Sequence, residues 1–169
     1  MQHLTTSNLV DILNESLTTV FDTMLSYSTV AQKSEDFSGQ KPPAPSLGGE
    51  NADASFVGSV GFVGELSGVL YLFVRSDFAF GAAEKITGLE KTEVDHEIVT
   101  DVCGELTNML AGSFKNTLAD QGFNSNLTIP TVLSGEELFI SSLNVATHIR
   151  HCVLVDGREV VVDLALSED

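Results

Sequence analysis

The sequence predicts an α/β (α+β) protein in which an antiparallel β-sheet packs against long α-helices. Two observations predict this fold class. Apolar residues recur with helical spacing in two long segments, residues 8–25 and 93–120. Several shorter runs are rich in Val, Ile, Leu and Phe, and Asp156-Gly157 separates the last two, which is the strongest hairpin pattern in the chain.

The amino-terminal part is expected to be a helix followed by strands. Thr5, Thr6 or Ser7 can cap the helix at 8–25, because a short hydroxyl side chain accepts a hydrogen bond from a free N–H group of the first turn. Three strands are then expected, at residues 27–32, 56–63 and 69–74.

Residues 34–52 interrupt this series. They contain three of the four prolines, together with Ser, Gly and acidic residues, and they have no apolar periodicity. We expect an exposed, mobile loop that joins elements of one domain.

The second half is expected to contain two helices and three strands. Ser76 or Asp77 is expected to cap a short helix that Gly88 ends, and Gly122 is expected to end the long helix at 93–120. The expected strands are residues 127–133, 147–155 and 159–166.

Composition limits the possible functions. A chain of 169 residues is expected to form one domain, 1–169. Its formal charge of -16 at pH 7 argues against nucleic acid or an anionic membrane as partner. No run approaches the roughly 18 apolar residues of a membrane span, so a cytoplasmic location is expected, with Cys103 and Cys152 reduced and buried.

The long helix carries a polar seam on the side away from its apolar face. At about 100° per residue, the five seam residues fall within roughly 80° of one another. They are Asp101, Glu105, Asn108, Gly112 and Lys115. The apolar face comprises Ile98, Val99, Val102, Leu106, Met109, Leu110 and Phe114. Glycine on an exposed helical ridge costs about 1 kcal/mol relative to Ala, and we interpret Gly112 as clearance for another molecule.

Spacing alone does not establish a function for the seam, because Glu and Asn three residues apart occur on many solvated helices. The first helix repeats part of the pattern with Asp11, Glu15 and Thr18, which suggests two related halves. Thr18 lacks a carboxamide, however, and Asp22 stands where the second copy has Gly112. We therefore expect the first helix to be an ordinary amphipathic helix.

The run Asp101-x-x-x-Glu105-x-x-Asn108, followed by Met-Leu-Ala-Gly and later by Pro130, resembles the active helix of the CheC/CheX/FliY family of chemotaxis phosphatases. The segment at residues 20–25 also resembles the matching part of CheX. With one complete active helix, the chain is similar to CheX rather than to its two-site relatives. Residues 34–52 have no counterpart in that pattern.

The resemblance implies a phosphatase that hydrolyses the aspartyl phosphate of a CheY-type response regulator in chemotaxis or related two-component signalling. Asn108 would orient the attacking water, and Glu105 would pair with a lysine of the receiver. Asp101, Gly112 and Lys115 would belong to the partner-binding surface, although Asp101 could equally support the helix and Lys115 could simply be solvated. The only metal implied is Mg²⁺ on the receiver, with no cofactor bound by this chain.

The family also implies a homodimer, for which the apolar hairpin at 147–166 is a candidate edge. An alternative function is a non-catalytic adaptor for a response regulator or the flagellar motor on the same fold. A metal site is not expected at His148, His151 and Cys152, because strand alternation places His151 on the opposite face from the other two.

Overall fold

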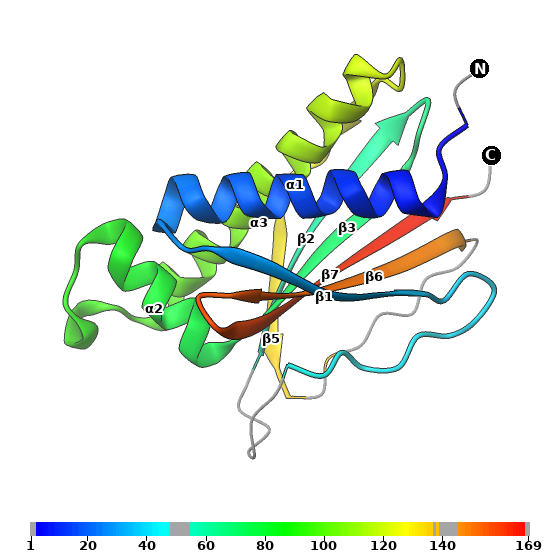
Figure 1. The fold of residues 1–169 in the computed structure, drawn as a ribbon. Helices are drawn as coiled ribbons and strands as arrows, with labels where there is room; N and C mark the ends of the chain where they lie inside the picture. Colours follow the sequence, from blue (N-terminus) through cyan, green and yellow to red (C-terminus); the bar gives the residue numbers. More distant parts are fainter. Residues whose placement is uncertain (1–2, 48–54, 137, 139–144, 168–169) are drawn as a thin grey trace.

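The structure, a computed structural model, describes residues 3–47, 55–136, 138 and 145–167 (Figure 1). The elements in chain order are α1 (Thr6–Leu25), β1 (Thr29–Asp36), β2 (Ser55–Gly64), β3 (Gly68–Arg75), α2 (Ser76–Thr87), the 3₁₀ turn η1 (Lys91–Glu93), α3 (His96–Asp120), β4 (Ser125–Leu127), β5 (Thr131–Gly135), β6 (Val145–Val155) and β7 (Arg158–Ser167). The strands form one antiparallel sheet in the order β1-β6-β7-β3-β2-β4, and β5 also pairs with β2. The predicted fold class is confirmed.

Local capping explains where the two long helices begin. Thr5 precedes α1, and its side chain and that of Asn8 exchange hydrogen bonds with each other's backbone N–H groups. Asp95 precedes α3 and accepts a hydrogen bond from the Ile98 N–H at 2.9 Å. The long helix therefore starts three residues later than predicted, because Lys91–Glu93 forms a separate turn.

The predicted cap of α2 is wrong. Arg75 occupies the N-cap position and its side chain caps nothing, while Ser76 and Asp77 already belong to the helix. Asp77 still stabilises the first turn, since its carboxylate accepts a hydrogen bond from the Phe78 N–H. Gly88 ends this helix as predicted, with φ of 72°.

The carboxy-terminal hairpin is confirmed, but its predicted role as a sheet edge is wrong. Asp156 and Gly157 connect β6 to β7 with φ values of 51° and 74°, the left-handed pair that a tight two-residue hairpin needs. β6 lies between β1 and β7, and β7 lies between β6 and β3. Both strands are interior, so their hydrogen-bonding edges are already paired.

The single strand predicted at 127–133 is also wrong. The segment is divided into β4 and β5, which pair with different parts of β2. Pro130 lies in the connector between them, where it has no N–H group to donate to a ladder. The connector is tied to β2 through Thr128, whose N–H donates to the Gly61 carbonyl at 2.8 Å.

The main core lies between the helices and one face of the sheet. Figure 1 shows α1 and α3 crossing that face, with α2 at one end. The apolar side of α3 points into this core as predicted, with Val99, Leu106, Leu110 and Phe114 at most 2% exposed. Phe21, Phe56 and Phe78 fill it from three other elements.

Helix α3 lies unusually close to β2. Gly58 of β2 faces Thr107 of α3, and a Cβ atom at position 58 would overlap the Thr107 hydroxyl oxygen. Thr107 itself is fully buried and donates its hydroxyl proton to the Cys103 carbonyl at 2.7 Å. The missing side chain at Gly58 therefore permits the close approach and sets the distance between helix and sheet.

The opposite face of the sheet carries a buried ionic cluster. Arg150 of β6 makes two hydrogen bonds to Asp163 of β7, at 2.8 and 2.9 Å, and His148 bonds the same carboxylate at 2.9 Å. Burial by itself raises the pKa of Asp163, but the hydrogen bonds from Arg150 and His148 and their charges outweigh it and hold the pKa below its usual value.

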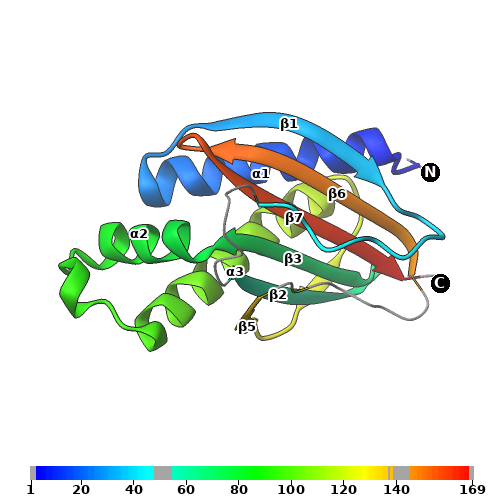
Figure 2. The same cartoon turned by 90° about the horizontal axis from the view of Figure 1, so that it is seen from below.

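Residues 37–47 pass across this second face, as Figure 2 shows from below. Phe37 packs on Arg150 and His148, and Leu47 packs on a small cluster that includes Phe73 and Val161. The loop predicted at 34–52 is thus wrong in two respects: β1 extends to Asp36, and Pro42 is buried. Residues 48–52 of that prediction lie outside the described residues.

We predict that Gly58→Ala destabilises the fold by about 1–3 kcal/mol, the usual cost of overfilling a packed core, because α3 must move away from β2. Urea unfolding measures this change. Gly112→Ala is the matched control: nothing lies within 4 Å of a Cβ there, and Ala should stabilise the helix by up to about 1 kcal/mol. Equal stability of the two variants would contradict the close contact, whereas partial rescue in Gly58→Ala/Thr107→Ala would support it.

We also predict that Asp163→Asn costs about 3–5 kcal/mol at pH 7, because it leaves Arg150 buried without its counter-charge. The native pKa of Asp163 is lowered, so the stabilisation is fully present above its unfolded pKa of about 3.9 and is lost as the pH falls through the lower native pKa. Urea unfolding from pH 7 to pH 2 should therefore give a shallower acid dependence for the variant. A parallel acid profile in wild type and variant would rule this role out.

Candidate functional site

The polar seam is presented on the open side of α3, as its spacing predicts. Asp101 and Glu105 are exposed, while Asn108, Gly112 and Lys115 are half-buried. All five come from one uninterrupted helix, so the helix itself sets their relative positions. The structure thus places the predicted carboxylate and carboxamide on one accessible ridge.

The polar side chains of the seam make no hydrogen bonds or ion pairs with other described residues. Within the described part of the chain, no hydrogen bond or ion pair engages Asp101, Glu105, Asn108 or Lys115. The Asn108 amide therefore keeps both its donor and its acceptor for another molecule. Gly112 adds space beside it, since nothing lies within 4 Å of the position that a Cβ would take.

Strand β5 borders the seam on one side. Val132 of β5 approaches Gly104, where an added Cβ would lie 3.5 Å from the valine methyl group. Farther back along the helix, His96 bonds the Ser134 hydroxyl of β5 at 3.0 Å, and its ring lies 5.3 Å from that of Phe56. The seam is therefore a ridge beside an edge strand, and the prediction of a single strand at 127–133 had missed this arrangement. Pro130 was the residue that could have revealed it.

The corresponding side of α1 differs from the seam. Asp11, Glu15 and Thr18 are exposed at the predicted offsets, but Thr18 donates its hydroxyl proton to the carbonyl of Asn14. The Asn14 side chain is bonded to His151 of β6 at 2.9 Å. This helix lacks a carboxamide at position 18 and is tied to the sheet, which fits an ordinary amphipathic helix.

The histidines of β6 lie on opposite faces of the sheet, as strand alternation predicts. His148 bonds Asp163 on the second face, whereas His151 is 2% exposed on the helix side and lies between Ser34 and Asn14. Burial lowers the pKa of His151, although the charge of Asp11 partly opposes this effect. A neutral ring suits its two hydrogen bonds, with one nitrogen donating to the Asn14 side-chain oxygen and the other accepting from Ser34.

Both cysteines are free and buried, which confirms that prediction. Burial raises the pKa of the Cys103 thiol to about 12 and also raises that of Cys152. Neither sulfur is poised as a thiolate nucleophile at neutral pH.

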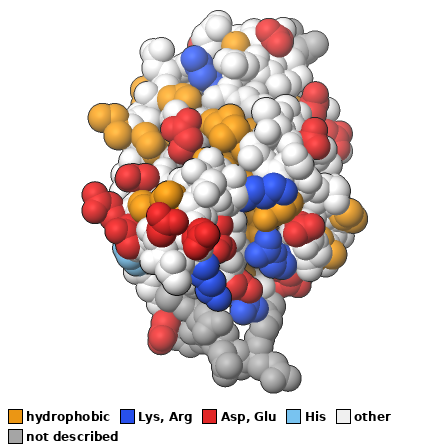
Figure 3. Space-filling model, turned by 90° about the vertical axis from the view of Figure 1, so that its left-hand side faces the viewer, with side chains coloured by type: hydrophobic (Ala, Val, Ile, Leu, Met, Phe, Trp, Pro, Cys, Tyr) orange, Lys and Arg blue, Asp and Glu red, His pale blue; other side chains and the backbone are white. Residues whose placement is uncertain are grey.

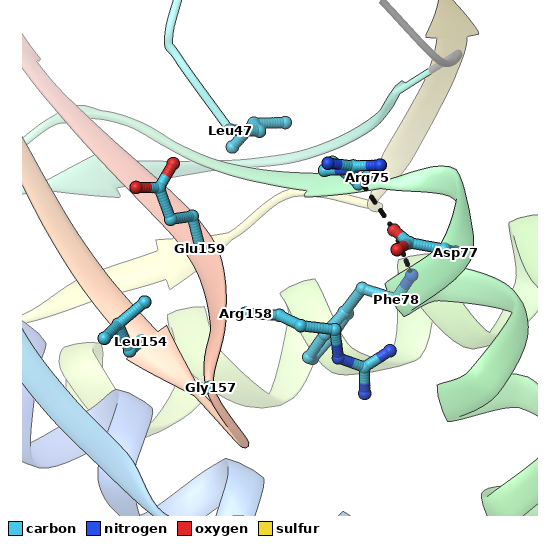
Figure 4. Close-up of a pocket in the computed structure, with 8 residues that line it drawn as sticks. All are labelled: Leu47, Arg75, Asp77, Phe78, Leu154, Gly157, Arg158 and Glu159. Atoms are coloured by element: carbon cyan, nitrogen blue, oxygen red, sulfur yellow. Dashed lines mark hydrogen bonds and ion pairs between the residues drawn. The ribbon is translucent and has the colours of Figure 1, made fainter. Parts of the chain in front are cut away.

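A cavity of about 300 Å³ lies away from the seam, between the start of α2, the β6–β7 hairpin and Leu47 (Figure 4). Three of its four charged side chains are engaged: Arg75 pairs with Asp77 at 3.3 Å, and the Arg158 guanidinium lies 4.7 Å from the centre of the Phe78 ring. Figure 3 shows the left-hand side of the molecule, where Lys and Arg side chains lie among acidic ones. None of the five seam residues lines the cavity, so it adds nothing to the predicted site.

Comparison with known proteins identifies the family. Residues 56–151, more than half of the chain, match the family described as chemotaxis phosphatase CheX. This chain belongs to the CheX family. The matched region contains the whole seam, so the family assignment and the candidate site concern the same helix.

One curated relative is the CheY-P phosphatase CheX of Thermotoga maritima, which is 34% identical over 92 residues. The aligned segment covers 54% of this chain and 59% of that relative, so the chain spans less than two thirds of the length of the protein it matches.

Two solved structures extend the likeness to nearly the full chain. A CheC-like superfamily protein from Shewanella sp. PV-4 has a TM-score of 0.77 at 24% identity and covers 98% of this CheX-family chain and 100% of its own. The CheX–CheY–BeF₃–Mg²⁺ complex from Borrelia burgdorferi has a TM-score of 0.68 at 21% identity, with coverages of 95% and 98%. At these identities the likeness is one of fold.

The helices of the described residues are all too short or too polar to cross a membrane.

Proposed function

We propose that this CheX-family protein hydrolyses the aspartyl phosphate of a CheY-type response-regulator receiver. The observation that carries the proposal is the accessible ridge of α3, where Glu105 and Asn108 have no hydrogen-bond or ion-pair partner among the described residues and Gly112 leaves space beside them. Two relatives support the choice of substrate: the Thermotoga maritima protein is named a CheY-P phosphatase, and the Borrelia burgdorferi CheX was solved with CheY.

Asn108 orients the attacking water in this proposal. To catalyse hydrolysis of a phosphoryl group, a protein mainly has to position the reacting groups and stabilise the charge of the transition state. A carboxamide can accept a hydrogen bond from water through its oxygen and donate one through its nitrogen, so it aligns the water without holding a charge of its own. The side-chain amide of Asn108 is available for this role because no described residue makes a hydrogen bond to it.

Glu105 anchors the receiver. It lies one helical turn before Asn108 on the same ridge, and as a carboxylate it pairs with a lysine of the partner. Asp101 and Lys115 extend the ridge in the two directions along α3 and contribute to the partner-binding surface. The receiver's own lysine and Mg²⁺ contact the phosphoryl group and offset its negative charge, so this chain needs no metal of its own for the hydrolysis.

The protein works in the cytoplasm as a homodimer in the same proposal. Its dimer contact uses a surface other than the β6–β7 hairpin edge, because both of those strands are interior. The outer edge of β1 is the candidate, since β6 is the one described strand that pairs with β1, and β1 is mostly exposed. Sedimentation of a monomer at tens of micromolar concentration would contradict the dimer.

The proposal predicts that the wild-type protein accelerates the decay of a receiver labelled by acetyl phosphate, and that Asn108→Ala reduces the acceleration by about a hundredfold or more because the water loses its alignment. Glu105→Ala should weaken binding to the receiver. Loss of label from the receiver with time measures the decay, and titration against a beryllofluoride-activated receiver measures binding.

Gln121→Ala is the matched control, since Gln121 is an exposed carboxamide at the C-cap of α3, more than three turns beyond Asn108, and its loss should leave the decay unchanged. Asn108→Ala that still binds but no longer accelerates decay supports the amide-positioned water. Binding by wild type without acceleration would replace the phosphatase by a response-regulator or motor adaptor.

A further inference from the structure

A serine, a histidine and an asparagine from three separate elements form a chain of hydrogen bonds on the helix side of the sheet. Ser34 of β1 is directly opposite His151 of β6 in the strand ladder, and its hydroxyl oxygen lies 2.9 Å from Nδ1 of the histidine ring. Nε2 of the same ring lies 2.9 Å from the side-chain oxygen of Asn14 of α1. The three groups therefore follow the order hydroxyl, imidazole, amide oxygen.

The amide oxygen determines where the protons lie along this chain of hydrogen bonds. Oδ1 of Asn14 has no proton to donate, so Nε2 of His151 carries the ring proton and donates it. Nδ1 is then unprotonated and accepts the hydroxyl proton of Ser34. A serine nucleophile, its general base and a group that orients the base are arranged in this way in a catalytic triad.

Burial prepares His151 to act as a base. The ring is 2% exposed, whereas Ser34 is exposed. Burial lowers the pKa of His151 below its usual 6.5, with the charge of Asp11 opposing this in part, so the ring is neutral and able to accept a proton at pH 7. The hydroxyl is thus accessible to another molecule while its base is shielded.

All three side chains line one cavity of about 340 Å³ between α1 and β1. Gln32 lines the same cavity as the extra residue of a β-bulge, because the pairing with β6 passes from Ala31 to Lys33 and skips Gln32. A glutamine carboxamide is a donor of the kind that stabilises an oxyanion. The cavity therefore offers space for a small molecule beside the serine, with a polar donor in its wall.

A second serine–histidine pair shows what Asn14 adds. Nε2 of His96 lies 3.0 Å from the Ser134 hydroxyl. In place of an amide oxygen, the other ring nitrogen of His96 meets the hydroxyl of Thr100 at 3.5 Å, and Thr100 donates its proton to the His96 carbonyl instead. His96 is also exposed. This pair lacks the orienting group and the shielding of the first, so Ser134 is a matched control for Ser34.

We propose that Ser34, His151 and Asn14 form a second catalytic site, which hydrolyses small carboxylic esters through an acyl-serine. Oγ of Ser34 attacks the ester carbonyl carbon while its proton passes to Nδ1 of His151. The tetrahedral intermediate expels the alcohol, which takes that proton, and the acyl group stays on Ser34. Water then attacks the acyl carbon and gives a proton to Nδ1, and this proton returns to Oγ as the carboxylic acid leaves.

Asn14 is a positioning residue in this site, because it acts on the substrate only through His151. An aspartate at position 14 would also stabilise the imidazolium that forms during the attack, which a neutral amide does not do. Asn14→Asp should therefore raise the rate of ester hydrolysis about tenfold or more. A hydrogen bond that served only to tie α1 to the sheet would give no such increase.

Hydrolysis of p-nitrophenyl acetate by the purified protein tests the proposal. Ser34→Ala and His151→Gln should each lower the rate about a hundredfold, the usual contribution of a positioned general base. Ser134→Ala should hydrolyse the ester as wild type does. A fluorophosphonate probe should label Ser34 and leave Ser134 unlabelled, which mass spectrometry of the digested protein measures.

The outcomes decide the second site without reference to the α3 ridge, because the assay contains no receiver. Hydrolysis lost in Ser34→Ala and raised in Asn14→Asp, with the label on Ser34, supports the site. An unlabelled Ser34, equal labelling of Ser134, or undiminished hydrolysis in Ser34→Ala overturns it. Ser34 is exposed, so its alanine variant keeps the core intact and decides the question if His151→Gln fails to fold.

Discussion

The close contact between α3 and β2 is the constraint on which the site depends. At Gly58 the sheet offers no side chain, so Thr107 packs directly against the strand and α3 lies closer to the sheet than a Cβ would permit. Thr107 and Asn108 are adjacent on the helix. The distance of Thr107 from β2 therefore determines how far the Asn108 side chain lies from the sheet. The position of the polar ridge is thus determined by packing on the opposite side of the helix.

The two faces of the sheet are stabilised by different chemistry. The helix side is a continuous apolar core, whereas the second face places Arg150, Asp163 and His148 in the middle of the strands. Such a cluster is tolerated only where its hydrogen-bonding groups find partners, and the two strands supply these directly across one ladder. Phe37 and the segment that follows it then shield the cluster from water.

Predictions from sequence patterns were correct for features that are set within one helix or hairpin. They were wrong for features that depend on contacts with other elements. Helical periodicity predicted the open seam, and Asp156-Gly157 predicted the hairpin, since both patterns follow from local backbone geometry. The hairpin was wrongly taken as an edge because its flanking partners, β1 and β3, come from distant parts of the chain. Pro42 was expected to be exposed because the proline-containing segment has no apolar periodicity, yet it is buried.

The sequence by itself determined the fold class and the set of five seam residues, because residue type and helical spacing suffice for both, and the family followed from the resemblance of its motifs to known proteins. Only the tertiary structure decided what surrounds the seam. It divided the predicted strand at Pro130, placed β5 beside α3 and left Ile129 exposed on the connector. These features depend on contacts between segments that no local pattern relates, such as Gly61 with Thr128 and Gly58 with Thr107.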